Sequence, residues 1–320
     1  MRGAFAAAAL AVTVLAVVIL EPPRTLLYFS GKSELVSVVV TDPARGLIQL
    51  SRAFDIDGQQ CRDGVSIAPA IGSVLHYQRP RGGDLLVQVE AKPGSQLILG
   101  TSRTRIDSDT LLRYRVSRNS DGCEFKGRVR LPAIGHLTVG RLYGVQPSPD
   151  EPLPLVLLTA KIQVYGRAIS TLLGFPLTFA PFAPGALYPV QEFLVPGGSA
   201  LGRALADERP SGLPAELTPW TGFVDLNDTD SDQALNVEAT SNARTVELFL
   251  PSPPTDRGAG GSDADRVSLT LGARLLGDPN LRWLFGLATV LLIVVPALWS
   301  ASGRVRIWRM RSFVAWLRRR

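Results

Sequence analysis

The region between residues 21 and 282 alternates apolar and polar positions along much of its length. Leu85, Val87 and Val89, for example, are separated by single residues that include Gln88. Similar alternation recurs in five further stretches, at residues 112–116, 123–131, 235–238, 246–250 and 267–271. A period of two places successive side chains on opposite faces of a strand, and turn-forming pairs that contain glycine separate the stretches. The pattern predicts an all-β region made of sandwich or barrel-like modules.

Three loops rich in proline and other turn-forming residues interrupt this β region, at residues 146–154, 210–219 and 251–265. Loops of this composition often separate compact modules. We therefore expect one β module at residues 33–146 and a second at residues 155–276. A single large sandwich is the alternative.

Two apolar segments flank the β region. Residues 4–20 are uncharged and lack the small-x-small exit of a cleaved signal peptide, so they predict an uncleaved signal anchor after a cytoplasmic start at residues 1–3. Residues 283–301 predict a second transmembrane helix, in which Trp283 and Trp299 would mark the two headgroup levels.

The basic charge of the chain is concentrated at its end. The formal net charge is +6, yet all 28 acidic residues lie between Glu21 and Asp278, and the tail at residues 302–320 has basic residues but no acidic ones. Segment 21–282 is slightly negative as a result, which argues against a nucleic-acid-binding surface on the main domain.

The basic tail also predicts the topology of the chain. Positive residues next to a transmembrane segment favour the cytoplasmic side, so both termini should lie inside and residues 21–282 outside the bacterial inner membrane, in the periplasm or the extracellular space. The tail is amphipathic as a helix, which predicts contact with anionic lipid or with a docking partner. The residues assigned to this contact are Arg304, Arg306, Trp308, Arg309, Arg311, Trp316, Arg318, Arg319 and Arg320.

The chain has two cysteines, Cys61 and Cys123, and both fall within the predicted exported region. An even number of cysteines in an oxidising compartment predicts a disulfide. Two buried free thiols are the alternative.

The sequence offers few candidates for catalytic chemistry. His76 and His136 are the two histidines, and neither lies beside a nucleophile motif, so we expect a protein that is not an enzyme. Asp228, Asp230 and Asp232 stand at alternate positions, from which carboxylates can converge on Ca²⁺. A solvated acidic turn is the alternative, and no other cofactor is expected.

Residues 168–191 form the least polar stretch of the predicted exported region, without a charge and with four prolines. The prolines argue against a third transmembrane helix. The stretch is either an apolar loop packed within the domain or a loop that binds a partner or dips into the membrane. We expect Phe175, Phe179 and Phe182 to contact a partner chain or the outer leaflet, because long apolar exposed segments usually mark interaction sites.

The layout of two spans with both ends inside and an exported domain resembles that of polysaccharide co-polymerases. Their exported part is helical, so the likeness concerns the layout alone. We expect a non-catalytic inner-membrane subunit of a bacterial envelope complex, for example one that exports or assembles a polymer. Its β domain would be a scaffold or would bind other membrane or periplasmic proteins, including a second copy of the chain. Two alternatives are a sensor whose β domain binds a small ligand or glycan, and a membrane-tethered hydrolase.

Overall fold

The computed structural model describes most of the β region and part of a helix near the C-terminus. The described residues are 25–79, 83–117, 123–125, 128–140, 157–168, 171–172, 175–176, 186–206, 216–226, 234–249, 265–268, 273, 276–287, 289–290, 293–294 and 297. The structure of these residues is dominated by strands, which confirms the predicted all-β class for this part of the chain.

Nineteen strands are present among the described residues. In chain order they are β1 (Thr25–Ser33), β2 (Leu35–Val40), β3 (Ile48–Asp55), β4 (Gln60–Ala68), β5 (Val74–Gln78), β6 (Leu85–Ala91), β7 (Gln96–Leu99), β8 (Ser102–Arg105), β9 (Thr110–Val116), β10 (Val129–Val139), β11 (Leu157–Arg167), β12 (Thr171–Leu172), β13 (Phe175–Pro176), β14 (Leu187–Val195), β15 (Ala200–Leu205), β16 (Trp220–Leu226), β17 (Leu235–Ser241), β18 (Thr245–Phe249) and β19 (Asp265–Ser268).

The chain divides into two compact units. The larger one, called the β unit below, comprises residues 24–165 and 191–269, and the second unit comprises residues 1–23, 166–190 and 270–320.

β10 is the strand on which the β unit is organised. Its residues from Val129 to Gly135 pair with β16, and its residues from Gly135 to Val139 pair with β2. Gly135 stands at this change of partner with a φ of +143°, and a Cβ atom there would lie 1.9 Å from the carbonyl oxygen of Val39. Only glycine allows the two backbones to approach this closely.

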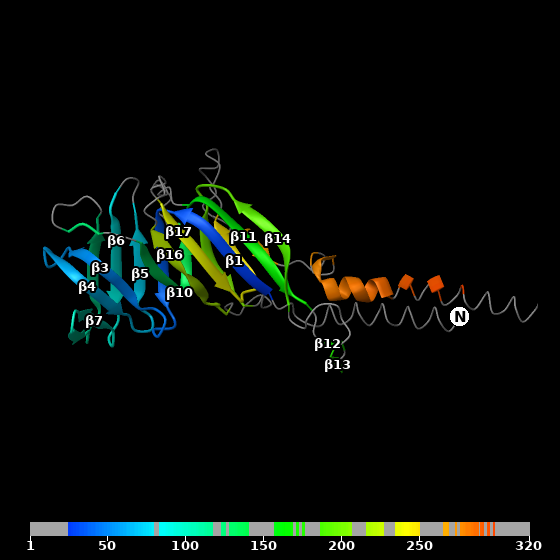
Figure 1. Cartoon of the computed structure of the whole chain (residues 1–320), viewed down its shortest axis with the longest axis horizontal. Coiled ribbons are helices and arrows are strands. Elements are labelled where there is room, and N and C mark those ends of the chain that lie inside the picture. Colours follow the sequence, from blue (N-terminus) through cyan, green and yellow to red (C-terminus); the bar gives the residue numbers. More distant parts are fainter. Residues whose placement is uncertain are drawn as a thin grey trace, which may run out of the picture. The chain divides into compact units, whose positions relative to one another are not determined.

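Three series of antiparallel pairings continue from β10. One runs from β2 through β5, β6, β9, β3, β4 and β7 to β8, and a second runs from β16 through β17 to β1. The third runs through β15 and β18 to β19. Figure 1 shows β3, β4 and β6 toward one end of the β unit and β1 and β11 toward the other, with β5, β10 and β16 between them.

Glu34 is all that separates β1 from β2, yet the two strands have different partners: β1 pairs with β17, and β2 pairs with β5 and β10. The β10–β16 pairing joins residues from the two predicted modules, 33–146 and 155–276, within one sheet. The division into two modules stays a prediction.

Side chains from all of these pairing series contribute to one hydrophobic core. In β6 the core side consists of Leu85, Val87 and Val89, as the alternation predicts. The ring of Trp220, fully buried, meets the ring of Phe29 edge to face with the centroids 6.4 Å apart. Burial of side chains as large as these is the main stabilising contribution of such a core.

Two local features differ from their sequence patterns. Asp63-Gly64 has the composition of a turn, but both residues lie within β4, where Gly64 has a φ of +63°. A glycine in a strand accommodates such a local irregularity without a steric penalty. The alternation over residues 123–131 also begins earlier than the regular strand, because β10 starts only at Val129.

In the second unit the short strands β12 and β13 pair with each other. A helix follows further along the chain, and Asp278 caps its N-terminus: Oδ1 of Asp278 accepts hydrogen bonds from the backbone N–H groups of Asn280 at 2.9 Å and Leu281 at 3.2 Å. Pro279 occupies the first helical position, where its missing N–H group costs nothing.

In the part of the chain that the structure describes, no helix reaches the length and apolar character needed to cross a membrane. The predicted first span at residues 4–20 and the tail at residues 302–320 lie outside the described residues, and the predicted second span at residues 283–301 is described only in part.

Candidate functional site

The predicted disulfide is present. Cys61 at the start of β4 is bonded to Cys123, and their Cα atoms are 5.6 Å apart. The bond ties the β3–β4 hairpin to the segment that precedes β10, across 62 positions of sequence. The bridge therefore links two parts of the β unit that lie far apart in the sequence.

A serine, a histidine and a glutamate meet on neighbouring strands of the β unit. Oγ of Ser37 lies 2.9 Å from Nδ1 of His76, whose Nε2 lies 3.4 Å from Oε1 of Glu90. Ser37 and His76 are direct cross-strand partners on β2 and β5. The sequence does not indicate this group, because its members become neighbours only through strand pairing.

This group does not have the geometry of a hydrolase site. Ser37 is completely buried, and nothing could reach its hydroxyl for attack without displacing the neighbouring strands. Glu90, the member of the group that would orient the histidine, is instead more than half exposed. The group therefore satisfies polar atoms within the sheet, and we assign it a structural role.

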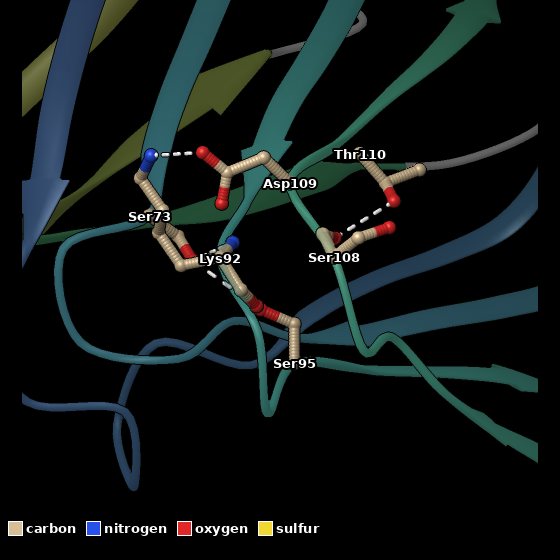
Figure 2. A network of polar contacts seen from close by, with 6 residues as sticks. All are labelled: Ser73, Lys92, Ser95, Ser108, Asp109 and Thr110. Atoms are coloured by element: carbon tan, nitrogen blue, oxygen red, sulfur yellow. Dashed lines mark hydrogen bonds and ion pairs between the residues drawn. The ribbon is translucent and has the colours of Figure 1, made fainter.

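A second buried polar group ties together the turns at the end of the same sheet (Figure 2). Ser73 and Ser95 are fully buried with their hydroxyls 3.3 Å apart, and Ser73 Oγ accepts a hydrogen bond from the backbone N–H of Lys92. The ammonium of Lys92 in turn donates to Asp109 at 2.6 Å. These contacts use the polar atoms of the serines for turn structure and leave no reactive arrangement.

The strongest candidate for a functional site is a pocket of about 420 Å³ on the β unit. Five strands contribute to it, β1, β11, β14, β16 and β17, together with Arg128, which directly precedes β10. Its lining consists of Ser30, Gly31, Lys32, Arg128, Thr159, Ala160, Lys161, Leu194, Asp225, Asn236, Val237 and Glu238.

Strand register explains why polar side chains gather here. Lys32 on β1 is paired with Asn236 on β17, Asn236 is paired with Asp225 on β16, and Asp225 is paired with Arg130 on β10. Direct cross-strand partners point to the same face of a sheet, so the four side chains form one row across four strands. The row faces away from the core residues Val237 and Val224 that alternate with it.

Asp225 is the centre of this row and is almost fully buried. Its carboxylate accepts two hydrogen bonds from Arg130, from Nε at 3.0 Å and Nη2 at 3.1 Å, and another from Nη2 of Arg128. The guanidinium of Arg130 also lies 3.9 Å from the centre of the Phe223 ring. The hydrogen bond to Asp225 raises the pKa of Arg130 above its usual value, which keeps the guanidinium charged.

The other side of the pocket carries a further hydrogen-bonded group. Nζ of Lys161 lies 3.8 Å from Oε2 of Glu192, and Gln163 donates a hydrogen bond of 2.6 Å to the same carboxylate oxygen. Tyr165 donates in turn to Gln163 at 2.9 Å. Three charged side chains of the lining, Arg128, Asp225 and Lys161, thus have partners that orient them before any ligand arrives, which lowers the entropic cost of binding.

The chemistry of the pocket suits non-covalent binding. Its lining combines cations, carboxylates, hydroxyls and one amide, which can hold a polar ligand through charge and hydrogen bonds.

The other predicted site residues are placed only in part. Asp228, Asp230 and Asp232, Phe179 and Phe182, and the arginines and tryptophans of the tail lie outside the described residues. Phe175 belongs to β13. In the described residues no group of three or more His, Cys, Asp or Glu side chains could hold a metal ion.

The residues of the pocket were not among those predicted from the sequence. Alternation marked the strands, but it could not show which strands become neighbours. The sequence contained one signal of the pocket. Arg128 and Arg130 alternate with apolar residues and so lie on the same face, where two neighbouring positive charges require a nearby carboxylate such as Asp225.

Comparisons of the chain with known protein families, with characterised proteins and with solved structures find no match.

Proposed function

We propose that this chain is a non-catalytic, membrane-anchored subunit of a bacterial envelope complex, and that its exported β domain, built as sandwich-like modules, binds partner proteins. In this proposal the two apolar segments, residues 4–20 and 283–301, anchor the chain with both termini in the cytoplasm.

One observation carries the anchoring part of the proposal. The helix that begins after Asp278 is buried at its first turns, where Leu281 and Leu284 are almost inaccessible, but it then exposes apolar side chains. The exposed ones are Leu287, Val290, Ile293 and Val294. A helix that exposes so many large aliphatic side chains is unfavourable in water and suits lipid or a partner's apolar surface.

The disulfide supports the exported location. Disulfides persist in oxidising compartments such as the periplasm and are rare in the bacterial cytoplasm. In this proposal the β unit lies outside the cytoplasm, and the apolar helix follows it closely in the sequence. This arrangement would hold the domain close to the outer leaflet.

A sensor is the second candidate, because the β unit contains a pocket lined mainly by polar and charged residues. In that case the β domain would bind a small ligand, and a partner chain would carry the cytoplasmic output.

Reporter fusions test the anchored topology in the full chain. A fusion after Arg320 should be active with a cytoplasmic reporter, and an insertion at residue 150 should be active with a periplasmic one. Periplasmic activity of the fusion at Arg320 would contradict the proposed topology.

Cross-linking in intact cells, followed by purification in mild detergent, tests the subunit role. The expected result is a specific membrane or periplasmic partner, or a second copy of the chain. A chain that is recovered as an uncross-linked monomer from intact membranes would contradict the subunit role.

A further inference from the structure

Arg128 lines the pocket on the β unit, where an ion pair orients its side chain while much of its surface stays accessible. Arg130 takes two hydrogen-bonding positions on Asp225 and lies over the ring of Phe223, while Arg128 reaches the same carboxylate through one nitrogen, Nη2. The side chain of Arg128 remains 58% exposed, and it lines the pocket, whereas Arg130 does not.

The arrangement gives the two arginines different tasks. Arg130 neutralises the buried Asp225. The carboxylate therefore orients Arg128 through one nitrogen and leaves its other N–H donors available. A guanidinium group offers five N–H donors in a planar fork, and this fork matches a carboxylate. Arg128 therefore presents a preoriented donor surface for an anionic group.

The charges around Arg128 limit how negative that group can be. Lys32, Arg128 and Lys161 contribute three positive charges to the lining, and Asp225 and Glu238 contribute two negative ones. Their partners outside the lining, Arg130 on Asp225 and Glu192 beside Lys161, add one charge of each sign, so the surplus stays at one positive charge. This small surplus favours a single negative charge, and the exposed carboxylate of Glu238 would repel a dianion such as phosphate more strongly than a monoanion.

The remaining lining favours a ligand that carries hydroxyl groups. Glu238 is an exposed carboxylate that accepts hydrogen bonds, and Ser30, Thr159 and Asn236 can each donate or accept them. Large aromatic side chains are absent from the described lining, so the pocket offers little to a purely apolar ligand. Its volume of about 420 Å³ is within the range of small-molecule sites.

We propose that this pocket binds an acidic sugar residue, with the carboxylate of the sugar on Arg128 and its hydroxyls on Glu238, Asn236 and the hydroxyl side chains of the lining. A free sugar acid and one unit of an acidic polysaccharide offer the same chemistry. The proposal concerns the pocket of the β unit and does not depend on membrane anchoring or on the subunit role.

Binding of glucuronate to the purified full chain in detergent tests the proposal, measured by calorimetry together with glucose and inorganic phosphate. Glucuronate should bind, and glucose and phosphate should each bind at least about tenfold more weakly. An oligosaccharide of several glucuronate units distinguishes the two sources: tighter binding than the monosaccharide indicates a polymer, and equal binding indicates the free sugar acid.

Two variants locate the binding. Arg128→Gln should weaken glucuronate binding about tenfold, since a hydrogen bond to a charged group is lost, and should leave the weak binding of glucose unchanged. Arg113→Gln is the matched control, because Arg113 is an exposed arginine of the β unit that pairs with Asp57 and is not part of the pocket. It should bind glucuronate as the unmodified chain does.

Thermal melting of each variant shows whether it is folded, and Arg128→Lys provides a second test that retains the positive charge. It should bind glucuronate with an affinity between those of the unmodified chain and Arg128→Gln. The proposal is overturned if glucuronate does not bind, if glucose or phosphate binds as well as glucuronate, or if folded Arg128→Gln and Arg128→Lys both bind it undiminished.

Discussion

At the scale of single residues, the clearest feature of this protein is a buried carboxylate with two arginine partners. Asp225 is almost inaccessible, while the side chains of Arg128 and Arg130 are more than half exposed. Most of the ion pairs between described residues are substantially exposed on both sides and contribute little to stability. Asp225 is different because removing its charge leaves two neighbouring cations without their shared acceptor.

Asp225→Asn is therefore expected to lower the free energy of unfolding by about 1–3 kcal/mol, because buried hydrogen bonds to a charged group are weakened. Asp84→Asn is the matched control: Asp84 lies 3.7 Å from Arg115, and both side chains are substantially exposed. Urea unfolding of the two variants compares them. Equal losses of stability would contradict the special role of Asp225.

His136 gives the protein a pH-dependent contribution to stability. Burial, with repulsion from Arg203 in addition, lowers the pKa of His136 below its ordinary value. The unfolded chain then takes up a proton more readily than the folded one. The contribution of His136 is fully present above its unfolded pKa of about 6.5 and is lost as the pH falls below it.

His136→Gln should make unfolding stability less dependent on pH. The expected result is a smaller drop in stability between about pH 7.5 and about pH 5.5 than in the unmodified chain, measured by urea unfolding at both values. An unchanged drop would show that other groups account for it.

At the scale of elements, β10 links strands that lie far apart in the sequence, and Gly135 makes this possible. Gly135→Ala should destabilise the β unit by about 1–3 kcal/mol or more, because the added Cβ would overlap the carbonyl of Val39. Gly72→Ala is the control. Gly72 also has a positive φ, of +82°, but no atom lies within 4 Å of the position of its Cβ.

Gly72→Ala should therefore have only the backbone penalty of about 1–2 kcal/mol that a left-handed conformation imposes on alanine. Thermal or urea unfolding separates the two variants. If Gly135→Ala were no more destabilising than Gly72→Ala, the close approach at Val39 would have no energetic consequence.

The disulfide acts on the same scale, since it joins the β3–β4 hairpin to the approach to β10. Replacing both Cys61 and Cys123 by alanine should lower stability by roughly 4 kcal/mol, because a loop of this length restricts the unfolded chain by about that amount. The measurement is urea unfolding of the double variant and of the unmodified chain. Addition of a reductant should lower the stability of the unmodified chain but not that of the double variant, which has no disulfide. A loss of stability below about 1 kcal/mol in the double variant would contradict the estimate.

At the scale of the whole molecule, residues 168–191 remain the predicted contact with a partner or with lipid. Replacing Phe175, Phe179 and Phe182 by serine should abolish recovery of the cross-linked partner while the chain stays folded. Circular dichroism and thermal melting monitor folding. If the loop is packed in a core instead, burying three hydroxyls in place of rings should cost several kcal/mol, and the variant would unfold.

The sequence alone predicted what depends on local periodicity and composition. Alternation at Leu85, Val87 and Val89 was sufficient to predict a strand and its buried face, because side chains along a strand point to opposite sides whatever its partners are. The even count of cysteines and their position in a region predicted to be exported were sufficient to predict the disulfide between Cys61 and Cys123, which the structure contains.

The tertiary structure decided which of these strands become neighbours, and with them the candidate site. Lys32, Asn236, Asp225 and Arg130 are spread over more than two hundred positions, and no local signal indicates that they share one row. Strand order and register follow from packing the whole core, in which a glycine such as Gly135 permits one close approach of two backbones. Long-range pairing is a property of the complete chain, so the pocket could be found only after the sheet was known.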